Sequence, residues 1–130
     1  MSSVRRHGFI ECDADTVWRF ISKMDNLHEW FPVVSTKVEG SKRWIQLANG
    51  ITFEEDILLV DHDLRRYQYS IVPNAIIKSH LATVDVIPDG DSRCIVVYST
   101  DMDPEVLALP IAGAAGEGIT KLAERFEGKN

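Results

Sequence analysis

The sequence predicts an α+β fold in which an antiparallel sheet wraps around a C-terminal helix, with a cavity between them. Two observations lead to this class. Residues 13–32 have the pattern of two short helices placed directly after a first strand. A long run of strands joined by turns follows, and a single helical segment begins at Asp103. This order of elements indicates a protein that binds something apolar more clearly than it indicates what is bound.

The N-terminal elements are a strand and two short helices. The strand is predicted over 4–12, with Phe9 among its core residues. Asp13 is a good N-cap for the first helix, because a carboxylate there can accept a backbone N–H of the first turn. We expect Asp25 to cap a second short helix that ends at Trp30. The apolar face of the first helix, at spacings i, i+3, i+4 and i+7, consists of Val17, Phe20, Ile21 and Met24.

Six further strands are predicted, most of them closed by a turn signal. Asn49-Gly50 is the strongest short hairpin signal in the chain. Pro88-Asp89-Gly90-Asp91 is a second turn rich in residues that favour turns. The regular spacing favours a meander, in which strands that follow one another in sequence are neighbours in the sheet. The predicted ranges are 33–38, 43–48, 51–60, 65–72, 76–87 and 93–102.

The last segment is predicted to be a helix that starts at Asp103-Pro104, with proline at the first helical position. Its second half has an apolar face at helical spacing. Its first half is weak in helix propensity, because it holds Pro110 and several glycines. We therefore expect a kink or break between Leu109 and Gly118. The apolar face consists of Ile119, Leu122, Ala123 and Phe126.

Composition and charge exclude several classes of protein. The 130 residues predict one domain over 1–130, and the net charge is −6. Basic residues are scattered as pairs, which argues against binding nucleic acid or an anionic membrane surface. We expect no leader peptide and no membrane insertion, since the start is polar and no run of about 18 apolar residues is present. The two cysteines, Cys12 and Cys94, predict buried thiols in a cytoplasmic protein. The sequence leaves open whether the protein is a monomer or a homodimer.

The alternation of side chains along each strand predicts which residues face the helix. The preferred inner sets leave Asp85, Arg93 and Asp101 on the outer face. The inner residues, strand by strand for 51–60, 65–72, 76–87 and 93–102, are Phe53, Glu55, Ile57 and Leu59; Tyr67, Tyr69 and Ile71; His80, Ala82, Val84 and Val86; and Cys94, Val96, Tyr98, Thr100 and Met102.

This inner face mixes many apolar side chains with a few polar ones. Such a mixture is typical of a small-molecule pocket, and it would also fit a filled core whose tyrosines reach water at its rim. The candidate ligand-binding residues are Trp30, Phe53, Glu55, Tyr67, Tyr69, His80, Tyr98, Thr100, Leu107, Ile111, Ile119 and Leu122.

The chain resembles the SRPBCC superfamily, also called START/Bet v 1-like, and especially its polyketide cyclase/dehydrase and lipid-transport branch. The resemblance covers nearly the whole chain, and both the order and the spacing of the segments agree. The segments that carry it are DADTVWRFIS at 13–22, W-F-P at 30–32, NGITFEEDILLVD at 49–61, RRYQYSIV at 65–72, HLATVDVIPDG at 80–90, CIVVYSTDM at 94–102 and GITKLAERFEG at 118–128.

The resemblance implies a helix-grip fold, in which a seven-stranded antiparallel sheet curls around a long C-terminal helix and two short helices lie between strands 1 and 2. Glu55 matches the recurrent strand glutamate of the family. His80 stands where an aromatic is common and Tyr98 where a tryptophan is common, so this pocket is more polar than that of many relatives. Members of the superfamily transport, bind, sense or catalyse, so fold alone does not choose the function.

Three functions remain open from the sequence. The first is binding of a hydrophobic or aromatic small molecule, such as a lipid, polyketide or related metabolite. The second is a cyclase- or dehydratase-like enzyme in which Glu55 or His80 acts as acid or base, since a carboxyl in an apolar interior has a raised pKa unless a cation pairs with it. Glu55 could also hold a ligand hydroxyl, or it could be a structural partner of a buried hydroxyl, a backbone group or an arginine. The third is a regulatory module with a collapsed cavity.

No cofactor or metal is predicted. His7, His28, His62 and His80 lie far apart in the sequence, so no metal-binding set is evident. The glycines at 113, 116 and 118 lack the preceding strand and the lysine that a phosphate-binding loop requires.

Overall fold

A computed structural model describes residues 2–127 and confirms the predicted fold class. Seven antiparallel strands form one sheet in the order β1-β7-β6-β5-β4-β3-β2. The strands are β1 (Ser2–Ile10), β2 (Ser35–Glu39), β3 (Lys42–Gln46), β4 (Thr52–Asp61), β5 (Arg66–Ile71), β6 (Ser79–Pro88) and β7 (Cys94–Asp103). The helices are α1 (Ala14–Ile21), the 3₁₀ helices η1 (Met24–Glu29) and η2 (Glu105–Leu107), and α2 (Ala108–Phe126).

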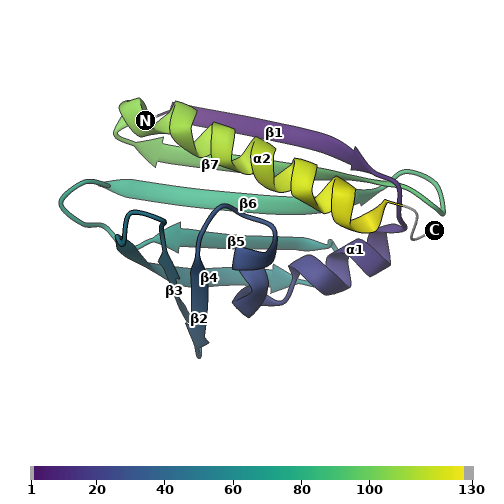
Figure 1. The fold of residues 1–130 in the computed structure, drawn as a ribbon, viewed down its shortest axis with the longest axis horizontal. Helices are drawn as coiled ribbons and strands as arrows, with labels where there is room; N and C mark the ends of the chain where they lie inside the picture. Colours follow the sequence, from purple (N-terminus) through teal and green to yellow (C-terminus); the bar gives the residue numbers. More distant parts are fainter. Residues whose placement is uncertain (1, 128–130) are drawn as a thin grey trace.

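The helices cover one face of a strongly twisted sheet. Figure 1 shows α2 running along the β1 and β7 side, with α1 and η1 near its C-terminal end. In the same view β2 and β3 cross the direction of β6 and β7 steeply. The core lies between these helices and the inner face of the sheet. Two short helices lie between β1 and β2, as the resemblance implied, and they close one end of the space under α2.

The start of α1 is as predicted. The Thr16 backbone N–H donates to the Asp13 carboxylate at 2.9 Å, which satisfies a donor that the helix itself leaves unpaired. The predicted N-cap of the second short helix, Asp25, is wrong. The N-cap of η1 is Lys23, which makes no side-chain cap, and Asp25 lies inside the first turn. The prediction that Phe9 is a core residue is also wrong. Phe9 is exposed on the outer face under the Arg93 guanidinium, whereas its neighbour Ile10 is buried.

The inner face of β4 changes after Ile57, because a β-bulge shifts the register there. Ile57 is opposite Tyr69, but the next paired residue, Leu59, is opposite the outward Gln68. Val60 is opposite the inward Tyr67 and packs on the core. The prediction that Leu59 faces inward is therefore wrong, because simple alternation fails across a bulge.

The C-terminal helix does not kink. α2 is continuous from Ala108 to Phe126, and the stretch starts at Glu105 after Pro104 instead of at Asp103. Pro110 is tolerated because it lies in the first turn of α2, where backbone N–H groups have no partner within the helix. Gly118 permits a close approach, since a Cβ there would lie 3.2 Å from the Trp30 ring. The weak propensity of this segment is thus outweighed by tertiary packing.

One helical stretch, Glu105–Phe126, has the length and mean hydropathy (1.3) that a membrane span requires. The core helix of a soluble protein can have the same properties. Here one face of the stretch is buried in the fold, through Ala112, Ala115, Ile119 and Leu122 among others.

Candidate functional site

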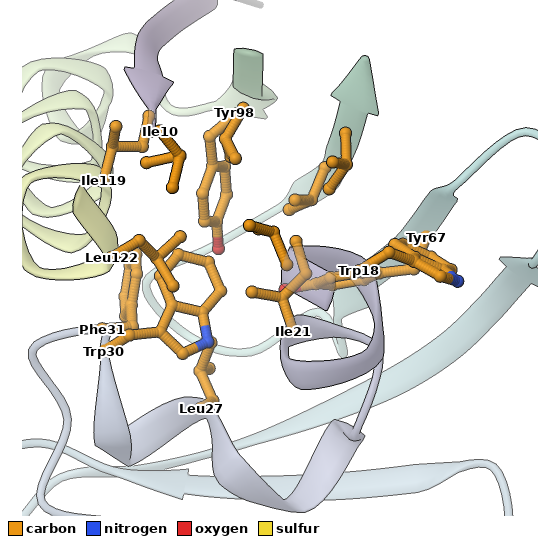
Figure 2. Close-up of a cluster of buried hydrophobic side chains, with 14 of the residues drawn as sticks. Ile10, Trp18, Ile21, Leu27, Trp30, Phe31, Tyr67, Tyr98, Ile119 and Leu122 are labelled. Carbon is orange, nitrogen blue, oxygen red and sulfur yellow. The ribbon is translucent and has the colours of Figure 1, made fainter. Parts of the chain in front are cut away.

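The space between sheet and helices divides into two halves. The closed half is filled by large side chains, among them Trp18, Trp30, Tyr67, Tyr98 and Leu122. Figure 2 shows Trp30 and Tyr98 pointing toward one another beneath α2, and their ring centroids are 5.9 Å apart. The open half lies under the N-terminal part of α2 and has a separate cluster built on Ile71, Ile77 and Met102.

A cavity of about 340 Å³ occupies the open half. Among its lining residues only Glu55, Tyr69 and His80 carry ionisable side chains, and the others are apolar. The apolar lining consists of Phe31, Pro32, Ile45, Leu47, Phe53, Ile71, Ile76, Ile77, Met102, Leu107, Pro110, Ile111 and Ala114. The cavity is covered by η2 and the start of α2, where Leu107 and Ile111 pack on the Ile71, Ile77 and Met102 cluster and Pro110 and Ala114 complete the lining.

The predicted site residues divide between the two halves. Phe53, Glu55, Tyr69, His80, Leu107 and Ile111 line the cavity. Trp30, Tyr67, Tyr98, Ile119 and Leu122 lie in the closed half and do not line it. Thr100 is buried on β7 outside the cavity.

Glu55 is held by an arginine, which was one of the alternatives left open by the sequence, although the sequence did not identify the partner as Arg43. Arg43 Nε donates to Glu55 Oε1 at 2.7 Å, and both side chains are 1% exposed. Arg43 Nη1 also donates to the Met24 carbonyl oxygen at 3.3 Å, which ties β3 to η1. The guanidinium stacks on the Tyr69 ring, 4.5 Å from its centroid. Glu55 is thus part of a structural network as well as a wall of the cavity.

Arg43 and Glu55 form an ion pair. Burial raises the pKa of the Glu55 carboxyl, and the attraction of Arg43 opposes that rise. Burial alone would lower the pKa of Arg43, but the charge and hydrogen bond of Glu55, together with Tyr67 and Tyr69, outweigh burial and raise that pKa. Because a guanidinium keeps its proton, a neutral Glu55 would leave an uncompensated cation in the interior, which costs several kcal/mol. We therefore take Arg43 as charged and Glu55 as a carboxylate at neutral pH.

The turn between β3 and β4 brings these two charges together. A two-residue Asn49-Gly50 turn would place Glu55 out of register with Arg43. The structure instead has a three-residue loop in which Leu47 N–H donates to the Ile51 carbonyl and Gly50 has φ 90°. Arg43 is then directly opposite Glu55. Two features of the sequence could have identified Arg43 as the partner of Glu55. The extra loop residue sets the register of β3 and β4, and the alternation of side chains along β3 places Arg43 and Ile45 on the same face.

His80 is positioned where β5 and β6 separate. Their ladder ends at Tyr69 opposite Ala82. Beyond it the Ile71 N–H donates to His80 Nδ1 at 3.0 Å, in place of a backbone carbonyl. Because Nδ1 accepts, the neutral ring carries its proton on Nε2. Burial lowers the pKa of His80 to about 4, and Asp101 opposes this shift, so the ring is neutral at pH 7.

Two cavity-lining residues retain polar atoms without a partner. His80 Nε2 and the second carboxylate oxygen of Glu55 make no hydrogen bond to any described residue. Tyr69 differs, since its hydroxyl is joined to that of Tyr98 and only its ring is available to the cavity. The apolar wall of the cavity therefore includes two residues, Glu55 and His80, that each have a polar atom not satisfied by any described residue.

Other features of the molecule offer less chemistry. A larger depression of about 790 Å³ lies between α1 and the end of α2, but it is shallow and open, and none of the predicted site residues lines it. Among residues 2–127 no three His, Cys, Asp or Glu side chains gather to hold a metal ion. Burial raises the pKa of the Cys94 thiol to about 12, so it is not an activated nucleophile.

Comparison with known proteins identifies the family. The family model described as "Polyketide cyclase / dehydrase and lipid transport" matches residues 1–127. The chain belongs to this family. Its resemblance to START/Bet v 1-like proteins is thereby confirmed. Comparison with curated proteins gives no match.

Solved structures of similar proteins agree on the fold. The protein XoxI from Bacillus cereus is 23% identical with a TM-score of 0.92, over 99% of this chain and 98% of that one. The di-domain ARO/CYC BexL from the BE-7585A biosynthetic pathway is 19% identical with a TM-score of 0.80, over 98% of this chain and 47% of that one. A START superfamily protein from Mycobacterium smegmatis is 12% identical with a TM-score of 0.77, over 98% and 99%. At these identities the similarity shows the fold alone.

Proposed function

We propose that this protein binds a small, largely apolar molecule in the cavity of the open half. The observation that carries the proposal is the cavity itself, about 340 Å³ with an almost entirely apolar wall. This volume is near the lower end of the range of about 300 to 1,000 Å³ for small-molecule sites. The ligand is accordingly a compact ring system or a short chain, and a lipid with two long acyl chains is too large.

Affinity and orientation would come from different parts of the wall. Apolar contacts contribute about 25 cal/mol per Å² of ligand surface removed from water. Glu55 and His80 then select among orientations, because each offers a polar atom that no described residue satisfies. A ligand that leaves either atom unpaired after displacing water loses about 1 to 3 kcal/mol.

An enzyme of the cyclase or dehydratase kind is the second candidate, supported by the family description and by the similarity to BexL. The geometry favours it less. The Glu55 carboxylate is bound by Arg43, and no hydrogen bond joins Glu55 to His80. A histidine with a pKa of about 4 is a weak base at neutral pH. The third candidate, a module with a collapsed cavity, is disfavoured by the size of the cavity.

Native mass spectrometry of the purified protein, followed by a thermal-shift screen of naphthalene-sized and short-chain compounds, tests the proposal. A ligand whose free concentration is 100 times its Kd stabilises the folded protein by about 2.7 kcal/mol. The matched variants are Ala114→Phe, which fills the cavity, and Thr120→Phe, which adds the same ring at an exposed site on α2. We expect shifts in wild type and Thr120→Phe, and none in Ala114→Phe. Shifts that survive Ala114→Phe, or no shift in wild type with any compound, would contradict the proposal.

A further inference from the structure

The charge of the cavity wall is unbalanced in a way that bears on the ligand. Glu55 lines the cavity, whereas its partner Arg43 does not. A ligand in the cavity therefore meets the carboxylate and not the guanidinium. The other ionisable lining groups are His80 and Tyr69, both neutral at pH 7 because burial lowers the pKa of the first and raises that of the second.

The free oxygen of Glu55 is an acceptor only. Arg43 occupies Oε1 through its Nε, and no described residue donates to the other oxygen. A carboxylate is satisfied by donors, and a hydrogen bond to a charged acceptor is worth roughly twice a neutral one. A ligand hydroxyl or ammonium supplies such a donor, while a ligand carboxylate supplies only further acceptors and like charge.

None of the described residues that line the cavity is a cation that would compensate an anionic ligand. His80 offers a neutral N–H at Nε2, which can pair with a carbonyl or ether oxygen but does not neutralise a carboxylate. Arg43 does not line the cavity: its Nε donates to Glu55, its Nη1 to the Met24 carbonyl, its guanidinium lies over the Tyr69 ring, and its buried Nη2 has no hydrogen-bond partner among the described residues. An anion in this apolar cavity would lose its hydration without gaining a counter-ion.

From these observations we infer that Glu55 is the specificity-determining residue of the cavity: it admits neutral ligands that carry a hydrogen-bond donor, such as alcohols and phenols, and rejects carboxylates, including fatty acids. His80 adds a preference for an acceptor elsewhere on the same molecule. The inference rests on the proposed function, since it concerns the same cavity.

The test uses naphthalene probes of one size that differ in a single group. They are 2-naphthol, 2-methylnaphthalene, 2-naphthoate and the cation of 2-(aminomethyl)naphthalene, titrated into the wild-type protein at pH 7 by calorimetry or tryptophan fluorescence. We expect 2-naphthol to bind about tenfold or more tightly than 2-methylnaphthalene, which lacks the donor. We also expect the cation to bind more tightly than the anion, although both lose hydration.

Glu55→Gln makes the sharper test, because it leaves Arg43 charged and without its anion. The prediction is a reversed preference, in which 2-naphthoate binds the variant more tightly than 2-naphthol and raises its Tm. If the variant folds poorly, recovery of its folded signal on adding 2-naphthoate is the same result. The double variant Arg43→Met/Glu55→Gln is the control, since it has no buried charge to compensate and should keep the wild-type preference for the neutral probe.

The outcomes separate the two claims. If no neutral probe binds wild type, the proposed function fails first. If 2-methylnaphthalene and 2-naphthol bind equally, or 2-naphthoate binds wild type as well as the cation does, the cavity binds ligands but Glu55 does not select them. If Glu55→Gln retains the wild-type order of probes, the inference is also overturned.

Discussion

The closed and open halves of the inner face are built from similar strands yet end in different states. Both halves have large apolar residues and tyrosines on the sheet, such as Tyr67 in the first and Tyr69 in the second. The two halves differ in the helical segments that lie over the sheet. Trp30, Ile119 and Leu122 belong to the packed cluster of the closed half, whereas Pro110, Ile111 and Ala114 line a cavity in the open half. The helices that cover the sheet therefore determine which part of its inner face can hold a ligand.

The largest expected loss of stability comes from truncating Trp30, which packs over the closed half. Trp30 has no exposed surface, so Trp30→Ala should cost about 3 to 5 kcal/mol of the free energy of unfolding. Ile111→Ala, in the open half, removes a partly exposed side chain beside an existing cavity and should cost less than about 2 kcal/mol. Urea unfolding of both variants checks the comparison. Equal losses would mean that the two halves do not differ in packing.

The second effect concerns the ion pair at the border of the halves. Arg43→Met leaves Glu55 buried without a partner and should cost about 3 to 5 kcal/mol, while Arg43→Met/Glu55→Leu should recover most of that loss. Urea unfolding in the absence of ligand measures both. Additive losses in the double variant would show that the two side chains are not coupled.

The third effect is a pH dependence specific to the open half. His80 has a pKa of about 4 in the folded state against an ordinary value of 6.5, so the folded state binds fewer protons between these values. Stability should therefore be complete above pH 6.5 and fall as the pH drops toward 4, by at most about 3 kcal/mol. Protonation also removes the acceptor for the Ile71 N–H.

His80→Gln is the control for this pH effect, since carboxylates elsewhere titrate in the same range. The difference between the wild-type and variant curves isolates the histidine. A difference that does not change between pH 6.5 and 4 would mean that His80 titrates normally in the folded protein.

Much of the fold could be predicted from the sequence, because alternation, turn residues and the Asp13 cap act locally. Glu55, His80 and Tyr69 were placed correctly on the inner face for the same reason. The errors came from non-local or single-residue events. A bulge after Ile57 changed the face of Leu59, and one extra loop residue paired Arg43 with Glu55.

The division of the predicted site residues was also out of reach of the sequence. Strand alternation treats Tyr98 and His80 alike, since both face inward. Only the packing of Trp30 and Phe31 against Tyr98 shows that this position is filled. Which part of an inner face stays open depends on contacts between distant segments, and no local pattern records them.

Methyl NMR of the protein titrated with 2-naphthol shows whether the ligand binds in the open half. We expect chemical-shift changes at the cavity methyls of Ile71, Ile77 and Ile111, and little change at Ile21 and Leu122 in the closed half. Changes centred on the closed half, or around the shallow depression at Trp18, would contradict this expectation, as would a spectrum that the probe leaves unchanged.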